Sequence, residues 1–342
     1  MGGLRSFVPR VVRRRVAAVA GRSRGAAIRR RLGALAARGT PIVAGPWMGE
    51  VGFEILYWAP FLRWFASEFQ VDPGRLTVVS RGGTAGWYAP VAGRYEDVLD
   101  HLSPSEFRQS RRDHAAEVGE QKQTRVTTRE RSLLDQVLEG LARDSVILHP
   151  SLMYELMNPF WWRHLDERWI LRHARYQRLA PPPRIAEVQL PDRYIAAKFY
   201  YNDCFPATEE NRAIVSRVIA QLSTEAPVVL LTTGVALDDH GAFLSAGAQS
   251  IDPATIAPPS DNLRVQSAIV ANAERFVGTY GGFSYLAPFY GVPCTAYYAD
   301  AAAFSRAHLT MAHTALASLG TPGLLDARQA RGGDAVSLTQ DT

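Results

Sequence analysis

The chain has 342 residues, 47% of them hydrophobic, which is enough to bury two cores and favours two domains. Its two cysteines, Cys204 and Cys294, are too few for a disulfide framework and lack the spacing of a zinc site. These counts exclude a disulfide-rich secreted protein and fit a cytoplasmic one, and we expect neither a metal site nor a cofactor.

The net charge of +5 is unevenly distributed. Residues 1–40 hold eleven arginines and no acidic residue, so the remaining 27 basic residues face all 33 acidic ones. This basic arm has no apolar run of the length of a spanning helix or a secretory signal. It could form a basic amphipathic helix on an anionic membrane, or a solvated or disordered tail. The valines that suggest the helix are Val8, Val11, Val12, Val16 and Val19. No aromatic interleaving or binding fold accompanies the arginines, so we predict no nucleic-acid partner.

The first folded element after the arm is a predicted strand over Pro41–Ala44. A glycine-containing loop follows, and a helix is expected from near Val51 to Phe69, kinked at Pro60. The glycine spacing is neither G-x-G-x-x-G nor a Walker A motif, which disfavours dinucleotide or P-loop chemistry.

The rest of the first half is predicted to alternate strands with helical or polar segments. Ser103 to Arg143 is polar and is interpreted as a loop or exposed helices that close with an amphipathic helix. The other predicted elements are a strand over Leu76–Ser80, a short element over Tyr95–Leu102, a strand over Ser145–Leu148 that ends at His149, and aromatic-rich helices after it.

Pro181-Pro182-Pro183 predicts the boundary between the halves, because consecutive prolines form a stiff spacer. The predicted domains are 41–183 and 184–325, with 326–342 as a disordered tail. The second half is expected to contain strands over Tyr194–Phe199, Val228–Thr232 and Ala248–Ile251, and a helix from Glu209 to Ser223 with Thr208 as its N-cap.

The stretch from Gln266 to Tyr298 predicts a helix, a strand over Arg275–Thr279, a glycine turn, a helix over Ser284–Tyr290 and a strand over Cys294–Tyr298. The helix would direct its unpaired N–H groups into the turn at Gly281, Gly282, Phe283 and Ser284, an arrangement that attracts phosphate. The alternative is an ordinary packing turn.

Alternating strands and helices in both halves predict an α/β fold of two Rossmann-like, doubly wound domains that face a central cleft. Ligands in such sheets bind at the carboxyl ends of the strands. The residues predicted there are Gly49 to Glu54, His149, Lys198 to Asp203, Thr232 to Gly234, Asp261 and Gly281 to Ser284.

Three segments together resemble the GT-B glycosyltransferases, within them the bacterial heptosyltransferase and fucosyltransferase-like groups. The segment EILYWAPFLR has an acidic residue and a proline six positions apart, as in the heptosyltransferases. The segment AAKFYYNDCFPATEENR resembles the strand, basic residue and acidic helix start that open their second domain. Residues 262–293 resemble their last motif, a helix, a strand, a glycine turn, a helix and Gly-Val-Pro. Lys198 stands where some of these families place a phosphate-binding arginine. Tyr280 and Tyr285 stand where heptosyltransferases usually carry Asp and His.

The resemblance implies an inverting, metal-independent transfer of a sugar from a nucleotide diphosphate donor to a cell-surface glycan or glycolipid, at the inner face of the membrane or in the cytoplasm. The donor would contact Lys198, Thr233, Gly234, Asp261 and the 281–284 turn. Glu54, or else Glu50, would be the general base, and Gly49, Gly52, His149 and Asp203 would contact the acceptor. A nucleotide-sugar epimerase or hydrolase of this fold, and a non-catalytic binding protein, remain the alternatives.

Overall fold

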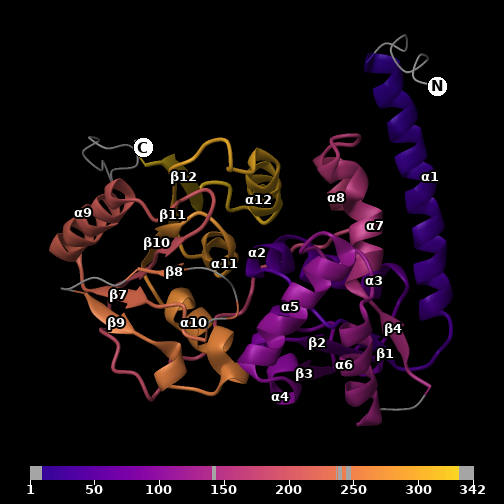
Figure 1. The fold of residues 1–342 in the computed structure, drawn as a ribbon, viewed down its shortest axis with the longest axis horizontal. Helices are drawn as coiled ribbons and strands as arrows, with labels where there is room; N and C mark the ends of the chain where they lie inside the picture. The colour runs from indigo at the N-terminus through magenta and orange to yellow at the C-terminus, as the bar shows by residue number, and fades with distance from the viewer. Residues whose placement is uncertain (1–9, 141–143, 236, 238–240, 244–247, 331–342) are drawn as a thin grey trace.

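The computed structural model describes residues 10–140, 144–235, 237, 241–243 and 248–330 (Figure 1). The chain forms two parallel sheets, one in each half of the sequence, with helices packed around both. This arrangement confirms the predicted α/β fold with two parallel sheets.

The sheet of the first half has four strands in the order β3-β2-β1-β4, and every neighbouring pair is parallel. Its strands are β1 (Ile42–Ala44), β2 (Leu76–Ser80), β3 (Arg94–Asp97) and β4 (Val146–Leu148). The chain moves outward from β1 to β3 and then returns to the other side of β1, so the order of strands reverses between β1 and β4.

Helices surround this sheet and account for the polar segment over 103–143. Two of them begin with capping boxes, Ser103 with Glu106 and Thr127 with Glu130, in which side chains satisfy the first free N–H groups of a helix. The helices are α1 (Arg10–Ala36), α2 (Val51–Phe53), α3 (Ala59–Glu68), α4 (Val98–His101), α5 (Pro104–Val118), α6 (Thr128–Glu139), α7 (Pro150–Trp161) and α8 (Glu167–Arg172), with short 3₁₀ segments at Pro73–Arg75 and Thr84–Trp87.

The helix predicted from Val51 to Phe69 is continuous but changes its winding near Pro60. A π-helical turn, Glu54–Trp58, joins α2 to α3, and Ala59 N–H bonds to Glu54 O, five residues back. Pro60 has no N–H to offer the Leu56 carbonyl, and that carbonyl accepts a 2.7 Å hydrogen bond from the Tyr176 hydroxyl instead. The helix therefore lacks one i−4 hydrogen bond at Pro60, as the proline predicts, and a π-helical turn that was not predicted lies directly before it.

The basic arm is helical over Arg10–Ala36, so the disordered tail given as an alternative is not found for these residues. Ala18, Ile28 and Leu32 are buried on one side of α1. A side chain at Gly21 would meet Pro159, and one at Gly25 would lie 2.5 Å from the Trp169 ring. Small residues at these positions let α1 pack closely against α7 and α8. Residues 1–9 lie outside the described part of the chain.

The sheet of the second half has six parallel strands in the order β12-β11-β10-β5-β7-β9. Its strands are β5 (Ile195–Lys198), β7 (Val228–Leu231), β9 (Gln249–Ile251), β10 (Arg275–Thr279), β11 (Cys294–Tyr298) and β12 (Leu325–Gln329), and β6 (Tyr200–Tyr201) pairs antiparallel with β8 (Gly241–Ala242) outside it. The order of strands reverses between β5 and β10, which is where doubly wound sheets bind ligands.

The helices described beside this sheet are α9 (Glu209–Glu225), α10 (Asn262–Ala271), α11 (Gly282–Phe289) and α12 (Arg306–Ser318), with 3₁₀ segments at Pro253–Thr255 and Pro259–Asp261. Thr208 caps α9 as predicted, since its side chain accepts from the Asn211 N–H.

The predicted tail begins too early. Residues 325–329 form β12, which pairs in parallel with β11, and a further helix, α12, precedes it. Residues 331–342, the rest of that predicted tail, lie outside the described part of the chain.

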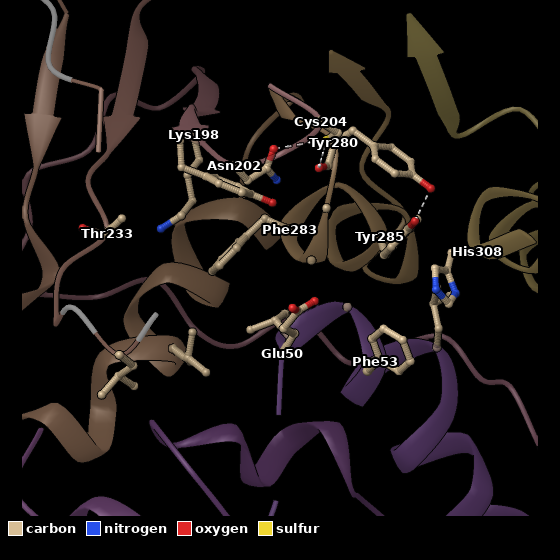
Figure 2. A pocket seen from close by; sticks show the side chains of 18 of the residues that line it. Glu50, Phe53, Lys198, Asn202, Cys204, Thr233, Tyr280, Phe283, Tyr285 and His308 are labelled. Carbon is tan, nitrogen blue, oxygen red and sulfur yellow. Dashed lines mark hydrogen bonds between the residues drawn. The ribbon is translucent and has the colours of Figure 1, made fainter. Parts of the chain in front are cut away.

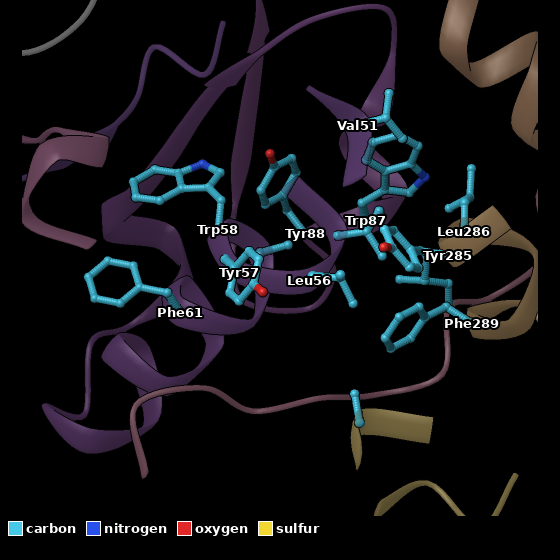
Figure 3. Close-up of a cluster of buried hydrophobic side chains, with 14 of the residues drawn as sticks. Val51, Leu56, Tyr57, Trp58, Phe61, Trp87, Tyr88, Tyr285, Leu286 and Phe289 are labelled. Carbon is cyan, nitrogen blue, oxygen red and sulfur yellow. The ribbon is translucent and has the colours of Figure 1, made fainter. Parts of the chain in front are cut away.

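The two halves share one apolar core rather than meeting only at a hinge. Val51 and Leu56 of the first half lie in the same cluster as Leu286 and Phe289 of the second (Figure 3). The Trp87 indole N–H also donates a 2.9 Å hydrogen bond to Tyr290 Oη across the boundary. A segment without helix or strand, 173–194, connects the halves and contains the predicted boundary at 181–183.

Candidate functional site

A cavity of about 450 Å³ lies between the two halves, beside the point where the strand order of the second sheet reverses. Its walls come from the start of α2 in the first half and from the ends of β5 and β10 in the second (Figure 2). Of the predicted site residues, it brings together Glu50, Gly52, Lys198, Asp203, Thr233, Gly281, Gly282 and Phe283.

Lys198 is the last residue of β5 and is only 5% exposed. Its ammonium donates hydrogen bonds to the Thr232 carbonyl, at 2.9 Å, and to the Gln266 side-chain oxygen. It also lies 4.6 Å from the centre of the Phe283 ring. These contacts hold a positive charge in the cavity wall. The charge lies at the end of β5, beside the point where the strand order reverses between β5 and β10.

The glycine turn after β10 brings two helix starts together. A Cβ at Gly282 would lie 2.8 Å from Val51 Cβ and 2.9 Å from the Gly52 nitrogen, so only glycine allows α11 to approach α2 this closely. Both helices therefore begin at the same wall of the cavity, with Gly52 and Gly282 among its lining residues. Helix starts carry partial positive charge and free N–H groups, so this wall favours an anion.

Ser284 supports this turn without lining the cavity. It is fully buried, its hydroxyl accepts from the Gly281 N–H at 3.0 Å, and it donates to the Gly281 carbonyl at 2.7 Å. These hydrogen bonds cap the start of α11. Ser284 does not line the cavity, so the predicted contact between Ser284 and the nucleotide-sugar donor is not supported.

Two further donor-site predictions lie away from the cavity. Asp261 forms a 2.8 Å ion pair with Arg264, and the hydrogen bonds and charge of that arginine lower the pKa of the Asp261 carboxyl. Gly234 has a φ of 62° and packs against Asn262 and Pro253. Asp261 is thus paired at the surface, while its neighbours Asn262 and Leu263 are the ones that line the cavity.

Glu54, our first choice as general base, is fully buried in the first half. Its carboxylate accepts hydrogen bonds from Ser80 at 2.5 Å and from Tyr88, and forms a 2.8 Å ion pair with Arg81. Burial raises the pKa of this carboxyl, and the Arg81 charge opposes that shift. A group with no surface on the cavity has no access to an acceptor hydroxyl, which argues against the base role.

Glu50, the second choice, lies on the cavity wall directly before α2 and is exposed (Figure 2). Asp203, predicted to contact the acceptor, also lines the cavity, on the side of the second half. These two carboxylates are therefore the predicted acidic groups that a bound ligand can reach.

The other two predicted acceptor residues do not reach the cavity. His149 caps α7, because its Nδ1 accepts from the Ser151 N–H at 3.1 Å, and its Nε2 lies 3.7 Å from the buried Glu130. Gly49 packs against the Trp47 ring, where a Cβ would lie at 2.9 Å. Both residues shape the first half rather than contact a ligand.

The two tyrosines that depart from the heptosyltransferase pattern form part of the cavity wall. The Tyr285 hydroxyl bonds to the Tyr280 hydroxyl, which donates onward to the Ser305 carbonyl at 3.1 Å. Burial raises the pKa of both phenols, so they stay neutral at physiological pH. They can orient a ligand by hydrogen bonds but cannot supply the charge that an Asp or a His would.

The predicted range Lys198 to Asp203 contains Tyr200, Tyr201 and Asn202, and all three line the cavity. Other lining residues were not predicted. His308 comes from α12, for which no helix was predicted. Phe53 lines the cavity within the predicted range Gly49 to Glu54. The other lining residues that were not predicted include Tyr57, Arg81, Arg111, Gln121, Asn262, Gln266 and Ser305.

His308 is neutral at physiological pH. Its Nδ1 and the Tyr57 hydroxyl share a 2.7 Å hydrogen bond, and its ring meets that of Phe53 edge-on, with 4.8 Å between centres. Burial, and then the nearby charge of Lys122, lower the pKa of this imidazole to about 4.

Within the described residues, no helix is both long and apolar enough to cross a membrane. No group of three or more His, Cys, Asp or Glu side chains suited to a metal ion occurs in that same part of the chain. The adjacent pair Asp238 and Asp239 lies outside it.

No known protein family and no curated protein matches the chain. Similar solved structures include ADP-heptose LPS heptosyltransferase II from E. coli, with 14% identity over 85% of this chain and 90% of that one, at a TM-score of 0.42. Another is E. coli heptosyltransferase WaaC with ADP, with 12% identity over 88% of this chain and 96% of that one, at a TM-score of 0.41. A third is the glycosyltransferase SnogD from Streptomyces nogalater, with 15% identity over 86% of each chain, at a TM-score of 0.39. Likeness at this level describes the overall arrangement only, so the residue roles below rest on the site.

Proposed function

We propose that the chain is a glycosyltransferase that moves a sugar from a nucleotide diphosphate donor to a glycan or glycolipid acceptor. The observation that carries the proposal is the meeting of Lys198 with the starts of α2 and α11 at one cavity, at the reversal point of the sheet. A departing nucleoside diphosphate gains negative charge, and fixed positive groups directed at it lower the barrier.

The proposed reaction is a direct displacement. The acceptor oxygen forms a bond to the anomeric carbon as the bond from that carbon to the diphosphate breaks, which inverts the configuration. Glu50 takes the proton of the acceptor hydroxyl, and Lys198 with the N–H groups at Gly282 and Phe283 stabilises the diphosphate that leaves. We assign no step to a metal ion, because these protein groups supply the stabilising charge.

A thermal-shift screen with GDP, UDP, ADP, CMP and dTDP, each beside its nucleoside, tests the donor class. We expect one diphosphate to raise the unfolding midpoint more than its nucleoside does. A ligand present at 100 times its Kd stabilises the folded protein by about 2.7 kcal/mol. The responding donor is then assayed with and without acceptor glycans. Sugar release or isomerisation without an acceptor would indicate the hydrolase or epimerase, and binding without turnover the non-catalytic protein.

We also propose that α1 attaches the protein to an anionic membrane surface. The 3.6-residue period places Val12, Val16 and Val19 on the side of α1 opposite its buried residues, and Val16 is 63% exposed. The same period places Arg13 and Arg24 along one edge of this valine stripe and Arg15 and Arg22 along the other. An apolar stripe between rows of arginine is the pattern of a helix that lies in a lipid interface.

A second apolar group lies near the same end of the molecule. Trp162, which follows α7, is 56% exposed, and Gly21 of α1 packs against Pro159 three residues before it. The amino end of α1 extends beyond α7 and α8 (Figure 1). Arginines near an anionic surface each contribute about 1 kcal/mol to binding, and tryptophan favours the interface.

Flotation with vesicles tests this attachment. We expect binding to vesicles that contain phosphatidylserine and not to pure phosphatidylcholine. The charge-neutral triple change of Val12, Val16 and Val19 to serine should weaken binding by about tenfold or more, since about three apolar side chains leave the interface. Because these valines are exposed, the unfolding midpoint should not change. Full binding by the triple variant would contradict the proposed role of the stripe.

A further inference from the structure

The chain contains only two lysines among its 38 basic residues. Lys198 lines the cavity, and Lys122 lies behind one of its lining residues, Phe53. Lys198 lies at the donor end, beside Thr233. Phe53 and His308 lie at the opposite end of the cavity (Figure 2). Lys122, from the loop between α5 and α6, has its ammonium near the Phe53 ring, and its charge acts on His308. The site proposed above uses Lys198 and gives no role to Lys122.

Lys122 lies over aromatic rings rather than beside a carboxylate. Its ammonium is 5.6 Å from the centre of the Phe53 ring and 5.5 Å from that of Trp161. Among the described residues, no Asp or Glu forms an ion pair with it. The side chain is half-buried, so its charge is only partly screened by water.

The rings around Lys122 form a wall suited to a sugar. Phe53, Tyr57 and His308 line the cavity, and Trp161 packs edge-on against Tyr57 with 5.2 Å between centres. Aromatic faces pack well against the apolar face of a sugar ring. Glu50 lines the same cavity, so the proposed base and this wall face one space.

A cation over a ring at a partly exposed position is held more weakly than a cation bonded to an anion. Lysine has a flexible stem with three rotatable donors, so Lys122 can leave the two rings for a bound anion. Burial and the charge of Lys122 lower the pKa of His308, so the positive charge beside these rings is carried by Lys122 rather than by the imidazole.

We propose that the Phe53, Tyr57 and His308 end of the cavity binds the acceptor, and that this acceptor is an anionic sugar whose carboxylate or phosphate pairs with Lys122. The word acceptor rests on the proposed transferase function, whereas the anionic-sugar site rests on these contacts alone. Two lysines at opposite ends would then separate a donor diphosphate from an acceptor anion.

Calorimetric titration with glucose, glucuronate and glucose 6-phosphate tests the site in the Lys198→Met protein, in which the donor lysine no longer binds anions. We expect at least one of the two anionic sugars to bind about tenfold or more tightly than glucose. Preference for glucuronate would identify a carboxylate, and preference for glucose 6-phosphate a phosphate.

Adding Lys122→Met should reduce the affinity for the preferred anion to that for glucose, while Lys122→Arg should retain the preference. Arg125→Met, an exposed change in the same loop, is the matched control and should alter nothing. Equal affinity for all three sugars, or a preference that survives Lys122→Met in the folded protein, would overturn the proposal.

The two proposals can fail separately. If no nucleotide shifts the unfolding midpoint but the protein still prefers an anionic sugar through Lys122, the transferase function is rejected and the anionic-sugar site stands. A nucleotide response without that preference would reject the site alone.

Discussion

Replacing Glu54 by glutamine is expected to lower the free energy of unfolding by about 3–5 kcal/mol, because it removes one charge of a buried ion pair. Glu54 is fully buried and Arg81 is 2% exposed, with 2.8 Å between the paired atoms. Glutamine is nearly the same size as glutamate, so the change removes charge rather than volume. Urea unfolding with linear extrapolation measures the loss.

Glu68→Gln is the matched control. Glu68 also pairs with an arginine, Arg29, but both side chains reach solvent. Removing one partner of an exposed ion pair costs about 1 kcal/mol or less. Equal losses for the two variants would mean that the Glu54 pair does not behave as a buried one, and the structural role we assign to Glu54 would be wrong.

Replacing Glu50 by glutamine is expected to slow turnover by about 10²- to 10⁴-fold, the usual contribution of a positioned general base. The amide retains the size of the side chain but cannot accept the proton. Donor affinity should stay close to that of the unchanged protein, because Glu50 contributes no positive charge to the diphosphate wall. Single-turnover kinetics with saturating donor separates the chemical step from binding.

Asp203→Asn is the comparison for Glu50→Gln, since Asp203 is another carboxylate on the same cavity wall. A smaller loss of turnover is expected there. If Asp203→Asn instead slows the chemical step more than Glu50→Gln does, the base is Asp203 and our assignment of Glu50 is incorrect.

The strands were the most predictable part of the fold. The bounds predicted for β2, β10 and β11 agree with the structure, because each is a short apolar run that ends at glycine or a polar turn. Strand β12 was not predicted, because its sequence, LDARQ, is mostly polar. As the edge strand it pairs only with β11, and an edge position needs little apolar sequence.

The packing of the arm over 1–40 could not be predicted from its sequence. Helix α1 has apolar residues on two nearly opposite sides, one buried against α7 and one exposed, so no single apolar stripe stands out in its sequence. Periodicity suggested a helix at the valines, but nothing in the sequence specified that Gly21 and Gly25 would pack it onto the domain. That packing depends on Pro159 and Trp169, more than a hundred residues away.

The candidate site was predictable where topology alone decides the position. Lys198 ends β5 and Gly281 to Phe283 follow β10, and the sheet order reverses between these two strands, so the residues had to lie near each other. The burial of Glu54 was not predictable, because it depends on Ser80, Arg81 and Tyr88 from a distant part of the chain. Local spacing alone could not distinguish Glu50 from Glu54.

The central claim is that Lys198 binds a nucleotide diphosphate, and calorimetric titration of Lys198→Met tests it most directly. The ligands are the diphosphate selected by the thermal-shift screen and its nucleoside. We predict that the variant binds the diphosphate about 10- to 100-fold more weakly and the nucleoside with unchanged affinity, since only the diphosphate meets the ammonium. Equal weakening of both ligands, or unchanged binding of the diphosphate, would contradict the claim.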